Sequence, residues 1–163
     1  MSDQFEVVEA TVAEIHDAML AGELTCEALV ERYLDRIDAY DRGGPGLKSI
    51  VTVNDDALER ATELDEALAA DGLVGPLHGI PILLKDQAET AGLRTTFGSE
   101  ACADYVPTTD ATVTAKLKDA GAVVLAKTNL PDFAASWFGY SSVIGRTKNP
   151  YDLDRDPGGS SSG

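Results

Sequence analysis

The chain has 163 residues, 44% of them hydrophobic, which is enough to bury the core of one globular domain and excludes a disordered chain. Acidic residues outnumber basic ones 28 to 13, and the resulting formal net charge of −15 disfavours nucleic-acid binding by this chain. The sequence shows neither an N-terminal targeting signal nor an apolar stretch of membrane-spanning length, which predicts a cytoplasmic protein with no membrane partner.

The first part of the chain is dominated by helical periodicity. Hydrophobic residues recur every three or four positions from Thr11 onwards, which predicts two amphipathic helices interrupted at Gly22, with Thr25 as the N-cap of the second. Residues 47–54, LKSIVTVN, are rich in β-branched side chains and predict a short strand. Residues 55–72 predict a helix that ends at glycine, and its buried stripe consists of Leu58, Ala61, Leu64 and Leu68.

The second part of the chain has the pattern of an α/β fold. Residues 80–84, IPILL, form a continuous apolar run that is typical of a strand covered on both faces. Residues 110–129 predict a helix followed by a second such strand, from Ala122 to Ala126, and the order strand, helix, strand favours a mainly parallel sheet. The remaining residues are loop-rich, with one short helix after Pro131. A helical segment at 8–72 is therefore expected to precede an α/β segment at 73–163.

The acidic residues and the cysteines bear on the salt environment of the protein, on disulfide bonds and on metal binding. Acidic side chains are spread through helices and loops instead of forming a tail, which suggests adaptation to high salt, although an acidic protein from an ordinary-salt organism would show the same excess. Cys26 and Cys102 lie far apart and fit neither a CxxC metal site nor a disulfide framework. No metal site is predicted.

A lysine ends the apolar run at residues 80–84. Lys85 either extends from a solvated strand end into water, or lies in an apolar environment that lowers its pKa and lets it act as a base. For a lysine at the end of an isolated strand, the solvated interpretation is the more common one. On a strand, the neighbouring Asp86 would point to the opposite face and would not hold Lys85 in its charged form.

The glycine-serine stretch at residues 156–163, DPGGSSSG, has three interpretations. It is a flexible linker, or a phosphate-binding loop, or a loop in which the glycines permit unusual backbone geometry and present a serine hydroxyl to a reacting group. The phosphate loop is the poorest of the three, because no lysine follows the glycines and no apolar strand leads into them.

Four blocks in series resemble the signature of the amidase signature family of serine hydrolases. They are GPLHGIPILLKDQAETAG, TTFGS, DATVTAKLKDAGAVVLAKTN and NPYDLDRDPGGSSSG, and the similarity runs from about Ala28 to Gly163. The resemblance implies that residues 1–163 are the N-terminal part of a single amidase signature domain. It implies N-terminal helices followed by part of a mixed, mainly parallel sheet flanked by helices, and it implies no metal or organic cofactor.

The resemblance also assigns roles to individual residues. It implies a Ser-Ser-Lys triad in which Lys85 is the catalytic lysine and Ser160 is the bridging serine, preceded by a cis peptide bond. In the family, the nucleophilic serine and the glycine-rich oxyanion hole lie beyond the position of residue 163. Ser136 matches a position near the acyl-binding cleft, although a role in turning its own loop explains it equally well. His16 and His78 have no carboxylate or serine at a motif spacing, and the family does not use them.

By this resemblance the protein is an amidase that hydrolyses a small carboxamide to a carboxylic acid and ammonia through an acyl-enzyme. Residues 129–150 look more like the free-standing amidases than like the alternative, the A subunit of a Glu-tRNA(Gln) amidotransferase, which would need partner subunits. A non-catalytic truncated product is a further alternative. The chain is expected to be inactive alone, and a homodimer of the full-length protein is compatible with the resemblance.

Overall fold

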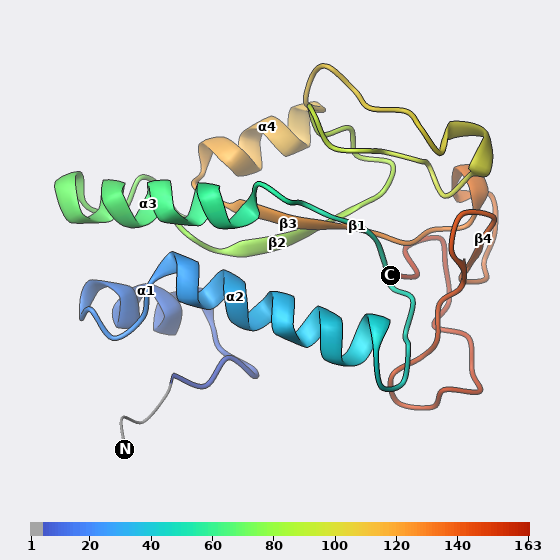
Figure 1. Ribbon diagram of the computed structural model, residues 1–163, viewed down its shortest axis with the longest axis horizontal. Helices are drawn as coiled ribbons and strands as arrows, with labels where there is room; N and C mark the ends of the chain where they lie inside the picture. The colour runs from blue at the N-terminus through green and yellow to red at the C-terminus, as the bar shows by residue number, and fades with distance from the viewer. Residues whose placement is uncertain (1–4) are drawn as a thin grey trace.

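The computed structural model describes residues 5–163, and it has a mixed α/β architecture in which helices flank a small sheet (Figure 1). The N-terminal part contains α1 (Val12–Leu20), α2 (Cys26–Arg36), the π-helical turn η1 (Ile37–Arg42), β1 (Ile50–Val53) and α3 (Ala57–Asp71). The remainder contains β2 (Pro81–Lys85), the 3₁₀ turn η2 (Glu100–Cys102), α4 (Thr112–Asp119), β3 (Val123–Thr128), the 3₁₀ turn η3 (Asp132–Ala134), β4 (Tyr140–Ser141) and β5 (Gly145–Arg146). The predicted α/β class is confirmed.

Side chains determine where the first two helices begin. A reciprocal capping box formed by Thr11 and Glu14 opens α1. Thr25 is the N-cap of α2, as predicted, and its side chain accepts a hydrogen bond from the backbone three residues later. The carboxylate of Asp65 on α3 accepts two further N–H groups at the start of α2, from Cys26 and the next residue, at 2.7 and 3.0 Å. This second cap joins α3 to α2.

The three longer strands form one mixed sheet with the order β1–β3–β2. β2 runs parallel to β3, and β1 runs antiparallel to it. Because α4 lies in the connection from β2 to β3, the predicted strand–helix–strand unit is confirmed. β3 is the central strand, and all of its residues are buried. In the β2–β3 register, Leu84 lies beside Lys127 and Lys85 lies beside Thr128, so these two pairs project from opposite faces.

The main hydrophobic core lies between the first three helices and the sheet. Figure 1 shows α1 and α2 on one side of the sheet and α4 on the other. Ala61 and Leu64 of the predicted stripe on α3 are buried, whereas Leu58 and Leu68 are partly buried at the margin of the core. The buried members are Ile15, Ala18, Met19, Leu24, Cys26, Leu29, Val30, Ala57, Ala61, Leu64, Ile80, Val123 and Leu125.

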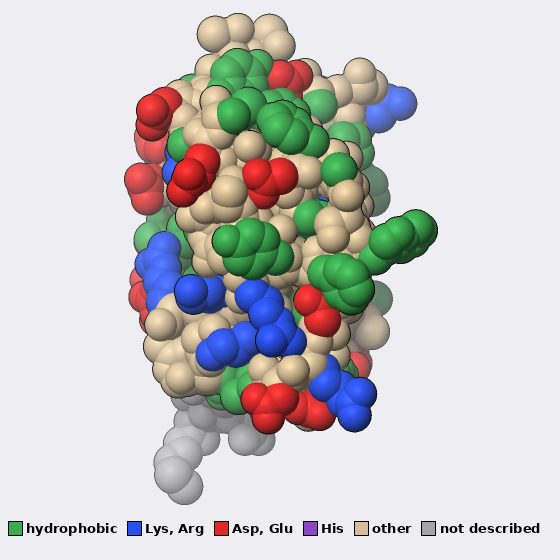
Figure 2. Space-filling model, turned by 90° about the vertical axis from the view of Figure 1, so that its right-hand side faces the viewer, with side chains coloured by type: hydrophobic (Ala, Val, Ile, Leu, Met, Phe, Trp, Pro, Cys, Tyr) green, Lys and Arg blue, Asp and Glu red, His purple; other side chains and the backbone are tan. Residues whose placement is uncertain are grey.

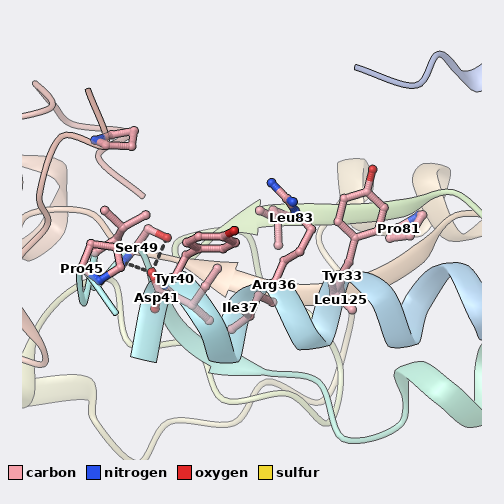
Figure 3. Close-up of a pocket in the computed structure, with 13 residues that line it drawn as sticks. Tyr33, Arg36, Ile37, Tyr40, Asp41, Pro45, Ser49, Pro81, Leu83 and Leu125 are labelled. Atoms are coloured by element: carbon pink, nitrogen blue, oxygen red, sulfur yellow. Dashed lines mark hydrogen bonds between the residues drawn. The ribbon is translucent and has the colours of Figure 1, made fainter. Parts of the chain in front are cut away.

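β2 departs from its prediction. The apolar run was expected to be covered on both faces, but Leu83 is 51% exposed. β2 is also an edge strand among the described residues. Leu83 contributes to an open hollow of about 590 Å³ between β2 and the helical segment formed by α2 and η1. Figure 3 shows Tyr33, Arg36 and Tyr40 on the helical side of this hollow and Leu83 on the strand side. The expectation of two covered faces is wrong for β2 and correct for β3.

The surface charge is unevenly distributed. Figure 2 shows Lys and Arg side chains gathered in the lower half of the face that looks to the right in Figure 1, despite the net charge of −15. No helix among residues 5–163 is long and apolar enough to cross a membrane.

Candidate active site

The structure brings Lys85 and Ser160 together from positions 75 residues apart, with the lysine Nζ 2.7 Å from the serine Oγ. Lys85 is half-buried at the end of β2, and burial lowers the pKa of its amine below the ordinary value. As an ammonium, Lys85 donates a hydrogen bond to Oγ. As a neutral amine, it can accept the hydroxyl proton of Ser160 across the same distance, so the contact suits proton exchange.

Two glycines shape the loop that carries Ser160. A Cβ atom at position 159 would lie only 3.0 Å from the carbonyl carbon of Trp137 and 3.1 Å from the carbonyl oxygen of Ser136, so this close approach of two backbones favours glycine at position 159. Gly158 has a φ of +87°, in the region that side chains disfavour. The peptide bond between Gly159 and Ser160 is cis.

Polar anchors hold the loop on both sides of Ser160. Before it, the carboxylate Oδ1 of Asp156 accepts hydrogen bonds from the backbone N–H groups of Gly139 at 3.1 Å and Gly158 at 2.8 Å. After it, the backbone carbonyl of Asn129, which directly follows β3, accepts from the N–H and hydroxyl of Ser162 at 3.3 and 3.2 Å. The position of Ser160 relative to the sheet is therefore determined by contacts from both directions.

Ser136 lies beside Ser160. The two serines line a shallow hollow of about 470 Å³ together with Ala134, Ala135, Trp137 and Gly159. The hydroxyl oxygen of Ser136 also accepts a hydrogen bond from the backbone N–H of Phe138 at 3.1 Å, which is the contact expected of a residue that turns its own loop. Because Oγ is the acceptor there, its proton can be donated to a second group. Both interpretations of Ser136 stay open.

The sequence reasoning missed a buried ion pair next to the site. Lys127 and Asp86 are both fully buried, and the lysine Nζ lies 3.2 Å from the carboxylate Oδ1. Lys127 also donates a hydrogen bond to the hydroxyl of Thr95 at 2.7 Å. Burial lowers the pKa of the Lys127 amine, and the carboxylate of Asp86 opposes that effect. The available signal was the run AVVLAK, another apolar strand that ends in lysine.

Several other candidates lie elsewhere. His78 is buried, and its Nδ1 accepts a hydrogen bond from the backbone N–H of Val74 at 3.2 Å, while His16 contacts the His78 carbonyl. Among residues 5–163, no hydrogen bond joins either histidine to Lys85 or Ser160. In the same part of the chain, no group of three or more His, Cys, Asp or Glu side chains is placed to hold a metal ion.

A family model for amidases matches residues 28–163, and the chain belongs to the amidase signature family. The structure resembles the peptide amidase from Stenotrophomonas maltophilia with a TM-score of 0.90 and 45% sequence identity, over 94% of this chain and 32% of that one. It resembles an amidase family protein from Bacillus anthracis with a TM-score of 0.89 and 36% identity, over 96% of this chain and 32% of that one. The predicted family and fold are confirmed.

Curated relatives include amidotransferase subunits. The A subunit of the glutamyl-tRNA(Gln) amidotransferase of Heliobacterium modesticaldum is 42% identical over 94% of this chain and 31% of its own length. That of Geobacter sulfurreducens is 43% identical over 97% of this chain and 32% of its own length. The chain therefore spans about a third of the length of the relatives it matches, and the catalytic roles of Lys85, Ser160 and Ser136 stay predictions.

Proposed function

We propose that the protein is an amidase that hydrolyses a carboxamide to a carboxylic acid and ammonia, and that residues 1–163 are the N-terminal part of its single catalytic domain. The observation that carries this proposal is the 2.7 Å contact between the Lys85 amine and the Ser160 hydroxyl. Membership of the amidase signature family supports amide chemistry. In this proposal a second serine, outside residues 1–163, is the nucleophile.

The contact supports a proton relay. Neutral Lys85 takes the hydroxyl proton of Ser160 while Ser160 takes that of the nucleophilic serine, whose oxygen attacks the carbonyl carbon of the amide. The C–N bond then breaks as the relay returns the proton to the leaving nitrogen, which releases ammonia and an acyl-enzyme. Water attacks the ester carbonyl, its proton enters the same relay, and the carboxylic acid leaves with the serine hydroxyl restored.

Ser136 is the proposed substrate contact. It lines the same hollow as Ser160, and its hydroxyl proton is free to bond an acceptor because its oxygen is the atom used by Phe138. A carboxamide or acyl oxygen presented in that hollow would find this donor next to the bridging serine. Trp137, which is 84% exposed, forms an apolar wall of the same hollow.

The second candidate is the A subunit of a Glu-tRNA(Gln) amidotransferase. The identity of 42% to such a protein from Heliobacterium modesticaldum favours it, but the 45% identity to a peptide amidase is equally high. The acidic composition disfavours direct nucleic-acid contact by this chain as a whole. The Lys and Arg side chains gathered on one face form a basic area where such contact would be less unfavourable (Figure 2). A non-catalytic product remains the third alternative.

The test is turnover by the full-length protein. Ammonia release from a panel of simple carboxamides is measured for the purified polypeptide with no other protein present. Ser160→Ala is expected to abolish release, whereas Ser161→Ala, at the exposed neighbouring hydroxyl, is expected to retain it. Amide turnover that appears only after partner subunits are added would favour the amidotransferase, and absence of turnover with and without them would refute both enzymatic functions.

A further inference from the structure

The buried pair of Lys127 and Asp86 lies directly behind Lys85. Asp86 follows Lys85 in the chain, and Lys127 is on the adjacent strand β3, level with Leu84. Lys85 lies level with Thr128, whereas the Asp86 side chain pairs with Lys127, the preceding residue of β3, so the Lys85 and Asp86 side chains lie on opposite faces of the sheet. Two lysines therefore lie near the ends of neighbouring strands on opposite faces of the sheet. Lys85 contacts Ser160 at 2.7 Å, and Lys127 lies 3.2 Å from the carboxylate of Asp86.

Asp86 is held by contacts on all of its polar groups. Its backbone N–H donates to the Thr128 carbonyl at 3.0 Å, and its own carbonyl accepts from the N–H of Phe97 at 2.9 Å. Carboxylate Oδ2 accepts from the N–H of Thr96 at 2.9 Å, while Oδ1 accepts no hydrogen bond within the described residues and faces the Lys127 amine as an ion pair. The residue next to the candidate base is thus fixed at the sheet end through both its backbone and its side chain.

We propose that Lys127 is a positioning residue for Lys85: it holds the Asp86 carboxylate on the far face of the sheet and offsets its charge, so that Lys85 can face Ser160 as a neutral amine. This inference rests on the proposed role of Lys85 as a base. Without Lys127, a buried and uncompensated anion would lie one residue from Lys85 and would favour the ammonium form. Thr96 donates to this carboxylate through both its N–H and its hydroxyl, which keeps the carboxylate in place on the far face.

The charged groups on the chain segments next to Lys85 and Ser160 are already engaged. Glu89, in the loop after β2, accepts a hydrogen bond from the Tyr105 hydroxyl at 2.6 Å. Asp156, on the segment that carries Ser160, accepts from two backbone N–H groups at 3.1 and 2.8 Å. The cause of the lowered pKa of Lys85 is burial. Asp86 is therefore the carboxylate next to Lys85 in the chain, and Lys127 is the cation paired with it.

The experiment measures the protonation of Lys85 directly. In the full-length protein, acetylation of individual lysines by acetic anhydride is followed against pH by mass spectrometry, because only the neutral amine reacts. Lys127→Met and Lys127→Gln are expected to raise the titration midpoint of Lys85 by roughly half to one pH unit, which slows its acetylation about three- to tenfold below the midpoint. The double variant Asp86→Asn with Lys127→Met removes both charges and is expected to restore the midpoint.

The two single variants separate charge from structure. Glutamine can still bond Thr95 and Asp86, so a purely structural role predicts that Lys127→Gln keeps the midpoint of the unaltered protein. A matched control is Lys118→Met. Lys118 lies on α4, and its amine forms another Lys–Asp pair, 2.9 Å from the carboxylate of Asp110. This control is expected to leave the Lys85 midpoint unchanged.

The positioning role of Lys127 is supported if the Lys85 midpoint is raised in both single variants and is restored to the value of the unaltered protein in the double variant. An unmoved midpoint in a folded Lys127→Gln protein overturns it. If both single variants fail to fold, a double variant whose Lys85 midpoint differs from that of the unaltered protein overturns it. The proposed function is judged separately: if the Lys85 midpoint shifts as expected but the unaltered protein releases no ammonia from any amide, it is the amidase proposal that fails.

Discussion

Replacement of Lys85 by arginine and by methionine tests whether the residue acts as a base or only as a hydrogen-bond donor to Ser160. Arginine keeps a cation and several donors at this position, but it has no neutral form near neutral pH. Methionine removes both functions while keeping a side chain of similar length. A donor role predicts that arginine preserves much of the activity, and a base role predicts that both variants lose it.

The two roles of the 2.7 Å contact predict different losses in kcat. A hydrogen bond to a charged group contributes about 1.5–3 kcal/mol, so loss of the contact alone would lower kcat about 10- to 150-fold. Loss of the base in a serine hydrolase triad lowers kcat by roughly 10⁴- to 10⁶-fold, since the triad acts as a unit. We expect the larger loss for both Lys85→Arg and Lys85→Met.

The pH profile provides an independent check. Burial lowers the pKa of Lys85 below 10.5. In the proposed mechanism, the active form of Lys85 is the neutral amine. The value of kcat/KM should therefore rise with pH, with the midpoint of this acid limb below pH 10.5. The limb should be absent from any residual activity of Lys85→Arg.

The assay is steady-state ammonia release by the full-length protein across pH, with Lys116→Arg at an exposed position of α4 as the control. The control should match the unaltered protein in both rate and pH profile. The reasoning would be refuted by a Lys85→Arg protein that keeps more than about a hundredth of the activity together with the same acid limb, because arginine cannot supply that titration.

Three further predictions concern the chain itself. Residues 1–163 assayed alone should release no ammonia from carboxamides, and turnover that depends on Lys85 would show instead that the nucleophile lies within them, among Ser160, Ser161 and Ser162. Asp65→Ala should lower the free energy of unfolding in urea by about 1–3 kcal/mol because two N–H groups of α2 lose their acceptor, while the exposed Glu66→Ala should change it by less than about 0.5 kcal/mol. If the acidic excess is an adaptation to high salt, the melting temperature should rise from low to molar salt, and equal midpoints would count against that interpretation.

Much of the local structure was predictable because it depends on neighbouring residues. Helical periodicity and the Thr25 cap located α2, and the apolar run from Ala122 to Ala126 located most of β3. The capping box of Thr11 and Glu14 is an equally local signal that the periodicity alone did not reveal. The burial of β2 was predicted incorrectly, since the exposure of Leu83 depends on which elements lie next to that strand and not on the composition of the strand.

In the candidate site, too, some features were predictable from neighbouring residues and others depend on contacts between distant ones. The family blocks pointed to Lys85 and Ser160, and the glycines before Ser160 indicated unusual backbone geometry, but neither observation required the two side chains to meet. Their 2.7 Å contact depends on anchors at Asp156 and Asn129 that hold a distant loop against the end of β2. Such contacts join residues far apart in sequence, where no periodicity reports them.

The amino-acid sequence alone established the α/β class, the positions of most helices and strands, and the presence of two apolar runs that each end in a lysine. The surroundings of the two lysines depend instead on tertiary structure. The parallel register of β2 with β3 places Lys85 on the face of Ser160 and Lys127 on the face of Asp86. Because side chains alternate along a strand, a shift of one residue in that register would exchange the two faces, and strand pairing is a property of the packed sheet and not of either strand alone.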